Sequence, residues 1–216
     1  MIKILDSKNS NYLFKLNSIL LKRRSASKDN TDIVKKIVKD VKKNKIKALL
    51  KYEKKFSKNN KIKISKKIFL NSIKKLDPKI KKTIDFSYKR ILNFHKNQKI
   101  KNLRFKDKLN NLFEYKFLPI DSVGIYVPAN LPSTLLMNAI PARLANVKRL
   151  VLANPKENGK VNPAVLYAAK KLNINEIYSM GGAQAVASLA YIQKVNKIVG
   201  PGNDYVARAK REVFGD

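Results

Sequence analysis

Val123-Gly124-Ile125-Tyr126-Val127-Pro128 decides the fold, because it is a short apolar run stopped by a proline. A run of this length without polar alternation is typical of a strand that is buried on both faces. Three further apolar runs follow it, each stopped by proline or glycine, at residues 150–153, 176–180 and 197–199. The sequence therefore predicts four short strands in its second half.

Helical segments separate these predicted strands. Apolar residues recur at helical spacing over residues 133–147, 163–172 and 183–192, and a further helix is expected from Asp204 onward. Strands that alternate with helical crossovers indicate a parallel sheet with helices on both faces. The predicted fold class is therefore α/β.

The first half of the chain reads as helices followed by a hairpin. Ser65 and the pair Asp77-Pro78 are typical helix starts, since a polar cap or an early proline satisfies the first turn. Two apolar runs around Asn110-Asn111 then predict a hairpin. We expect a helical N-terminal region over residues 1–102, a hairpin and boundary over 103–118, and a sheet domain over 119–216.

Composition excludes several classes of chemistry from these 216 residues. The chain has no cysteine and one histidine, His95, which rules out a disulfide framework, a thiolate zinc site and a cysteine nucleophile. His95 is expected near the end of a helix, where a structural or solvated role is the favoured interpretation. The N-terminus is charged early, and no apolar run approaches the roughly 20 residues that span a bilayer. We therefore expect a cytoplasmic protein that does not enter the membrane.

The charge is strongly positive and unevenly placed. The net charge is +33, and residues 1–110 hold 35 Lys and Arg against 8 Asp and Glu. A basic half of this kind can bind nucleic acid or another anionic surface. The lysines nevertheless occur as scattered pairs without interleaved aromatics, and Lys, Ile and Asn all have A/T-rich codons. Mutational bias is the competing explanation, and charge alone does not predict a nucleic-acid-binding protein.

The alternation also locates a candidate ligand site. Ligands of open parallel sheets bind beyond the carboxyl ends of the strands, and here those ends carry Gly181-Gly182 and Gly200-Pro201-Gly202. Glycine lets a ligand approach the backbone, and the helix starts that follow favour an anionic group. Tyr126, Gln184 and Asn203 lie at the same strand ends. No G-x-G-x-x-G fingerprint is present, so these turns alone leave a phosphate or nucleotide site and an ordinary structural turn equally open.

Three motifs, in this order and spacing, are more specific than the fold pattern. Together they resemble the histidinol dehydrogenase family, strongly over residues 121–216 and more weakly over residues 1–120. The motifs are Gly124-Ile125-Tyr126-Val127-Pro128 with Leu136-Met137-Asn138-Ala139-Ile140-Pro141-Ala142, then Gly181-Gly182-Ala183-Gln184-Ala185, then Lys197-Ile198-Val199-Gly200-Pro201-Gly202-Asn203.

The resemblance implies a Rossmann-like sheet of the aldehyde-dehydrogenase type, truncated at residue 216. It implies an NAD-dependent oxidoreductase of histidine biosynthesis, which oxidises L-histidinol to histidinal and then to histidine while zinc holds the substrate. It also implies a homodimer in the full-length form. By the same resemblance Tyr126, Gln184 and Asn203 contact NAD, and the zinc ligands and catalytic residues lie beyond residue 216.

Two loops look shorter than the family pattern, at residues 129–131 and between about residues 191 and 194. We predict that this chain is the NAD-binding N-terminal portion and does not oxidise histidinol alone. Two alternatives stay open: a non-catalytic fragment that binds NAD or a partner, and a basic nucleic-acid-binding protein.

Overall fold

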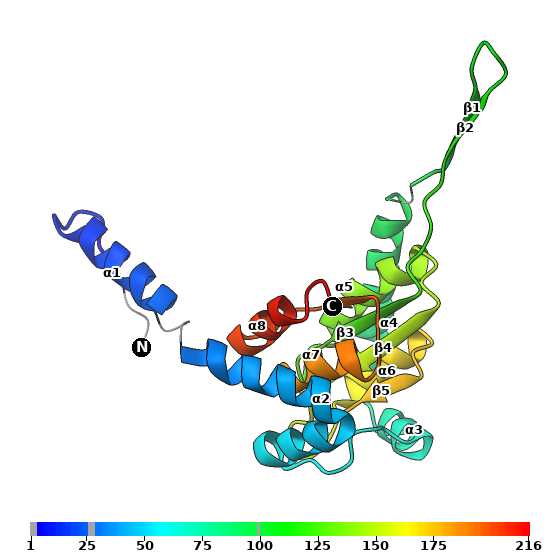
Figure 1. The fold of residues 1–216 in the computed structure, drawn as a ribbon. Helices are drawn as coiled ribbons and strands as arrows, with labels where there is room; N and C mark the ends of the chain where they lie inside the picture. The colour runs from blue at the N-terminus through cyan, green and yellow to red at the C-terminus, as the bar shows by residue number, and fades with distance from the viewer. Residues whose placement is uncertain (1–3, 26–28, 99) are drawn as a thin grey trace.

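Four helices precede the sheet, in keeping with the predicted helical character of the first half. The computed structural model describes residues 4–25, 29–98 and 100–216 (Figure 1). The Ser65 side chain accepts a hydrogen bond from Ile68 N, and the Asp77 side chain accepts one from Lys79 N. Both predicted helix starts are therefore confirmed. The helices are α1 (Tyr12–Ser25), α2 (Asp29–Ser57), α3 (Lys66–Lys74) and α4 (Pro78–Lys96).

The predicted hairpin is present and projects from the body of the molecule (Figure 1). Its strands β1 (Leu103–Lys106) and β2 (Leu112–Tyr115) pair antiparallel, with Phe105 opposite Phe113. Asn110 adopts a left-handed φ of 64° in the connecting turn, which asparagine tolerates better than most residues. Every residue of both strands is exposed.

The second half forms the parallel sheet that the apolar runs predict. Its strands lie in the order β5-β4-β3-β6, and every neighbouring pair is parallel. The mixed α/β class with a parallel sheet is therefore confirmed. The elements are β3 (Ser122–Tyr126), α5 (Pro132–Leu144), β4 (Arg149–Ala153), α6 (Pro163–Lys171), β5 (Glu176–Tyr178), α7 (Gly182–Tyr191), β6 (Lys197–Val199) and α8 (Asp204–Glu212).

Successive side chains along the strands point to opposite faces of the sheet and contribute to two separate hydrophobic cores. The α5/α6 core lies on one face of the sheet and receives Leu150 and Leu152 of β4, together with apolar residues of α3 to α6. The α2/α7 core lies on the other face and receives Val151 and Ala153 of the same strand. Because both faces are covered, the strands are mainly apolar after their polar first residues, and this explains why they read as short apolar runs.

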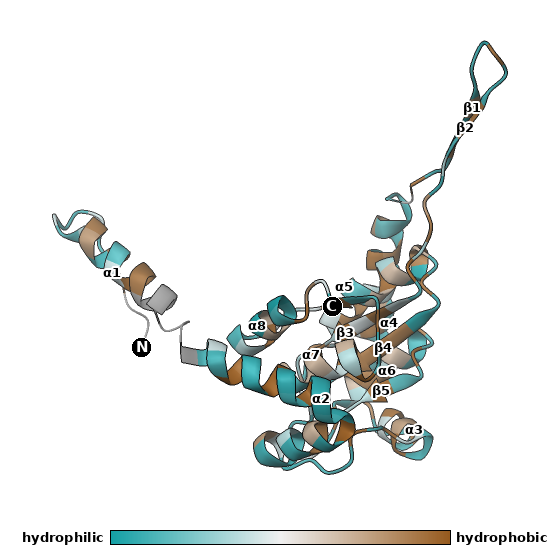
Figure 2. Ribbon diagram, in the orientation of Figure 1, coloured by the Kyte–Doolittle hydropathy of each residue, from teal (hydrophilic) through white to brown (hydrophobic). Residues whose placement is uncertain are grey.

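Helix α2 supplies much of the α2/α7 core. Its buried residues recur at helical spacing, and the rest of its surface carries lysines, so one side is brown and the other teal in Figure 2. The buried apolar residues are Val34, Ile37, Val38, Val41, Ala48 and Leu49. The first half of the chain thus packs directly on the sheet, while its division at residues 102 and 118 stays a prediction. No described helix is long and apolar enough to span a membrane.

Candidate functional site

The turns after β3, β5 and β6 meet at one edge of the sheet, because the carboxyl ends of parallel strands point the same way. Gly200 passes very close to the end of β3. Its φ is +107°, and a Cβ placed there would lie 2.0 Å from the carbonyl oxygen of Tyr126. Only glycine permits this approach, and it brings the turn between β6 and α8 against the last residue of β3.

Tyr126 reaches from β3 to the start of α7. Its side chain is buried, and its hydroxyl oxygen accepts a hydrogen bond from the backbone N–H of Gly182 at 3.4 Å. Burial raises the pKa of the Tyr126 phenol, and the nearby charge of Glu53 acts in the same direction. The phenol therefore keeps its proton and contributes a neutral, polar group to the strand-end edge.

Gln184 lies in the first turn of α7 and is only 3% exposed. Its side-chain Nε2 donates a hydrogen bond to Glu53 Oε1 at 2.9 Å. The same carboxylate oxygen accepts the backbone N–H of Gly181, also at 2.9 Å. A carboxyl group from α2 therefore already occupies the start of α7, where the sequence pattern favours an anionic ligand.

Asn154, directly after β4, shapes the segment that follows β3. The residue is fully buried, and its Nδ2 donates to the carbonyl oxygens of Val127 and Pro128 at 3.0 Å each. Within the described part of the chain, its Oδ1 has no hydrogen-bond partner. Buried polar atoms are normally paired, so this edge of the sheet holds acceptor capacity that the fold does not use.

Asn203 lies at the start of α8 and is exposed. Its Oδ1 accepts a hydrogen bond from Val206 N at 3.2 Å, which caps the helix. The amide Nδ2 is the remaining polar group of this side chain, and it can donate to a ligand. Nearby, Lys210 Nζ donates to the carbonyl oxygen of Gly200, which places a cation at the end of β6.

Of the three predicted site residues, the structure brings two together. Tyr126 and Gln184 meet around the first turn of α7, whereas the recorded hydrogen bond of Asn203 lies within its own helix. Sequence reasoning missed Glu53 and Asn154. Glu53 follows the buried Leu49 by four positions on the apolar face of α2. An isolated acidic residue at an apolar helical position was thus the available sequence clue.

His95, the sole histidine, lies away from this edge. Its Nδ1 is 2.6 Å from Gln98 Oε1, and it lines a groove of about 1220 Å³ between the end of α4, α5 and β6. The residues that the structure describes contain no group of three His, Cys, Asp or Glu side chains close enough to hold a metal ion. These residues therefore do not fit a zinc centre.

A parallel sheet covered on both faces, with a polar cluster at the carboxyl ends of its strands, defines an α/β protein of the ligand-binding, doubly wound class. Family comparison narrows this class. The family model described as histidinol dehydrogenase matches residues 21–216, so the chain belongs to the histidinol dehydrogenase family.

Named relatives agree with this assignment. A histidinol dehydrogenase of Pelagibacter ubique is 57% identical over 100% of this chain and 52% of its own length. A histidinol dehydrogenase of Rhodospirillum rubrum is 37% identical over 98% of this chain and 51% of its own length. The crystal structure of histidinol dehydrogenase from Elizabethkingia anophelis superposes with a TM-score of 0.79 at 35% identity, covering 84% of this chain and 44% of that one. The chain thus spans about half the length of the curated relatives it matches, and it corresponds to an N-terminal portion of the family.

Proposed function

We propose that this chain is the NAD-binding part of an oxidoreductase that converts L-histidinol through histidinal to L-histidine, at the end of histidine biosynthesis. Membership of the histidinol dehydrogenase family supports the reaction. The observation that carries the NAD-binding role is the cluster of Tyr126, Gln184 and Glu53 at the carboxyl ends of the strands. This is the edge where open parallel sheets bind ligands.

The residues at this edge fit a polar cofactor. Buried acceptors without a described partner, Glu53 Oε2 and Asn154 Oδ1, lie in the segments around it. In the proposal, Tyr126, Gln184 and Asn203 bind NAD through their hydroxyl and amide groups. Bound NAD supplies the acceptor for the hydride that leaves histidinol. The chain's own residues bind and orient the cofactor.

The acid–base and zinc chemistry of the reaction is assigned, in this proposal, to residues outside these 216. The chain has a single histidine and spans about half of its relatives. Because no group of three metal-binding side chains lies among the described residues, the proposal gives them no part in holding zinc. The expected homodimer of the full-length form and the cytoplasmic location stay predictions.

Calorimetric titration of the purified chain with NAD tests the proposal. Gln184→Ala and Asn203→Ala should each weaken binding by about 5- to 150-fold, because a hydrogen bond left unmade costs about 1–3 kcal/mol. Gln98→Ala is the matched control, since Gln98 is an exposed glutamine beside His95. Failure of the unaltered chain to bind NAD would contradict the proposal. With L-histidinol, NAD and zinc added, the chain alone should form no NADH, and steady turnover would refute that part.

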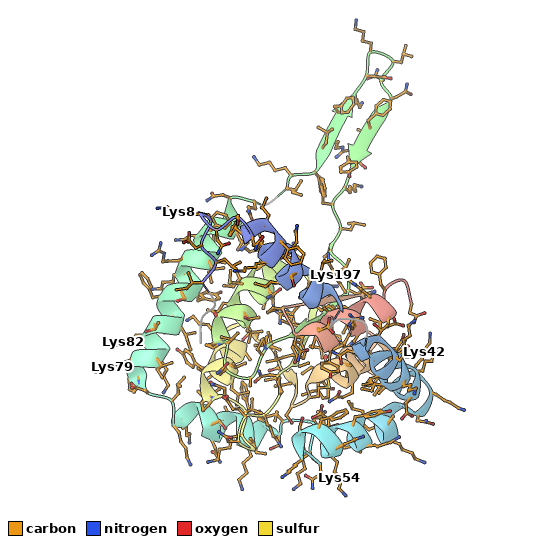
Figure 3. The ribbon with its side chains drawn as sticks, turned by 90° about the vertical axis from the view of Figure 1, so that its left-hand side faces the viewer. Lys8, Lys42, Lys54, Lys79, Lys82 and Lys197 are labelled. Carbon is orange, nitrogen blue, oxygen red and sulfur yellow. The ribbon has the colours of Figure 1, made fainter. Side chains whose placement is uncertain are left out.

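The arrangement of the lysines gives no support to a nucleic-acid-binding face. Figure 3 labels six lysines at separated places: Lys8 before α1, Lys42 and Lys54 on α2, Lys79 and Lys82 on α4, and Lys197 on β6. A nucleic-acid site needs basic side chains gathered on one face or along one groove. The six labelled lysines are not gathered in this way.

A further inference from the structure

Glu53 joins the N-terminal helices to the proposed cofactor site. It lies near the end of α2, and it is 0% exposed. Its carboxylate oxygen Oε1 accepts two hydrogen bonds from residues more than one hundred positions along the chain, from Gly181 N and from Gln184 Nε2. Tyr126 completes the group, because its hydroxyl accepts from Gly182, the residue between them.

This geometry determines which groups remain for a ligand. The Glu53 carboxylate accepts a hydrogen bond from the backbone N–H of Gly181, the N-cap residue of α7. This N–H is therefore not free to bind a ligand phosphate. The carboxylate also fixes one amide hydrogen of Gln184. The second amide hydrogen and Oε1 of Gln184 are then held in a defined direction, with Oε1 3.1 Å from the point that a Cβ on Gly182 would occupy.

A hydrogen-bond partner such as Glu53 holds a side-chain amide in one orientation more firmly than packing alone. Gln has three side-chain torsions, and fixing a rotamer-rich side chain on binding carries an entropic cost. A group that fixes the side chain before the ligand arrives removes this cost from the binding step.

We propose that Glu53 is a positioning residue for the NAD site, acting through Gln184 and the Gly181-Gly182 turn. The inference rests on the proposed NAD-binding function and deepens it. Glu53 need not touch NAD. It presents a fixed acceptor oxygen, and the position of that oxygen matters more than the negative charge that it carries.

Two substitutions of Glu53 distinguish the effect of the oxygen's position on NAD affinity from the effect of its negative charge. Glu53→Gln keeps an acceptor oxygen at the same place and removes the charge, so NAD affinity measured on the full chain should stay within about threefold of the unaltered chain. Glu53→Asp keeps the charge but withdraws the oxygens by one methylene, so affinity should fall about 5- to 50-fold. The opposite order, with Asp binding normally and Gln failing, would overturn the proposal.

A double-mutant cycle tests the route through Gln184. Glu53→Ala and Gln184→Ala should each weaken NAD binding, and the double variant should lose less affinity than the product of the two single losses, because part of the effect of Glu53 passes through Gln184. Losses that multiply would show that Glu53 acts independently of Gln184 and would refute the proposal. Val41→Ala is the matched control. Val41 is a fully buried residue of α2 in the same α2/α7 core, so it should lower stability without changing NAD affinity.

These outcomes distinguish a failure of the proposed NAD-binding function from a failure of the proposed role of Glu53. An unaltered chain that does not bind NAD contradicts the proposed function itself. An unaltered chain that binds NAD, with Glu53→Ala and Glu53→Asp binding equally well, leaves the proposed function standing and refutes the role of Glu53. Should Glu53→Ala fail to fold, the comparison of Asp with Gln decides the question.

Discussion

At the scale of single residues, the strand-end site depends on contacts that no local pattern encodes. Tyr126 and Gln184 were predictable because each lies at the end of an apolar run or the start of a helix, inside a recognisable motif. Glu53 was not predicted, because its partners lie 128 and 131 positions away. Periodicity reports which face of a helix is buried and does not report what that face will meet.

The buried negative charge of Glu53 lowers the stability of the fold by an amount that depends on pH. Burial raises the pKa of its carboxyl above the ordinary value of 4.5, although hydrogen bonds from Gly181 and Gln184 oppose this shift. A group whose pKa is raised by folding contributes stability that is fully present below the unfolded pKa and is lost as pH rises through the folded pKa.

Glu53→Gln should therefore gain stability relative to the unaltered chain as pH rises above the ordinary carboxyl pKa of 4.5, since an amide does not ionise. Urea unfolding at several pH values measures the difference in unfolding free energy. Ser188→Ala is the control. Ser188 is a fully buried, uncharged residue of α7, and its substitution should give a difference that does not change with pH. A flat profile for Glu53→Gln would contradict the prediction.

At the scale of elements, the sequence predicts which segments form helices and strands, but it does not predict which strands lie next to each other in the sheet. The four predicted apolar runs correspond to β3 to β6, with boundaries that differ by at most two residues. The sheet order β5-β4-β3-β6 did not follow from these runs, because adjacency depends on how the crossover helices pack on each face.

Helix α2 contains a break that its apolar pattern does not reveal. Lys45 adopts φ 48° and ψ −125°, a conformation that residues with a side chain rarely take. Asp40 braces the break, accepting hydrogen bonds from Asn44 on one side and from Tyr52 on the other. These contacts lower the pKa of Asp40 to about 2, the Asn44 bond contributing most.

Lys45→Gly should stabilise the protein by about 1 kcal/mol, because glycine adopts this conformation without strain. Lys47→Gly is the matched control. Lys47 is an exposed residue with helical geometry in the same helix, so glycine should there destabilise by about 1 kcal/mol. Thermal unfolding of both variants gives the sign of each change. A loss of stability in Lys45→Gly would show that the contacts of the lysine side chain outweigh the backbone strain.

At the scale of the whole molecule, the two hydrophobic cores do not follow the expected division of the chain at residues 102 and 118. Residues from the first half enter both. Ile73, Leu76 and Ile84 belong to the α5/α6 core, and the buried face of α2 belongs to the α2/α7 core. The sheet separates the two cores, and β4 contributes side chains to each of them.

Because the cores share one sheet and both halves of the chain, loss of either should expose apolar strand surface and remove support from the other. We therefore expect a single unfolding transition, with far-ultraviolet and tyrosine near-ultraviolet circular dichroism changing together in urea. Leu49→Ala in the α2/α7 core and Leu166→Ala in the α5/α6 core should each lower the free energy of unfolding by about 2–5 kcal/mol. Both leucines are essentially fully buried. Each substitution should shift the whole transition under both probes. Two separate transitions, with Leu49→Ala shifting only one of them, would contradict this expectation. They would mean that the helical region and the sheet unfold independently.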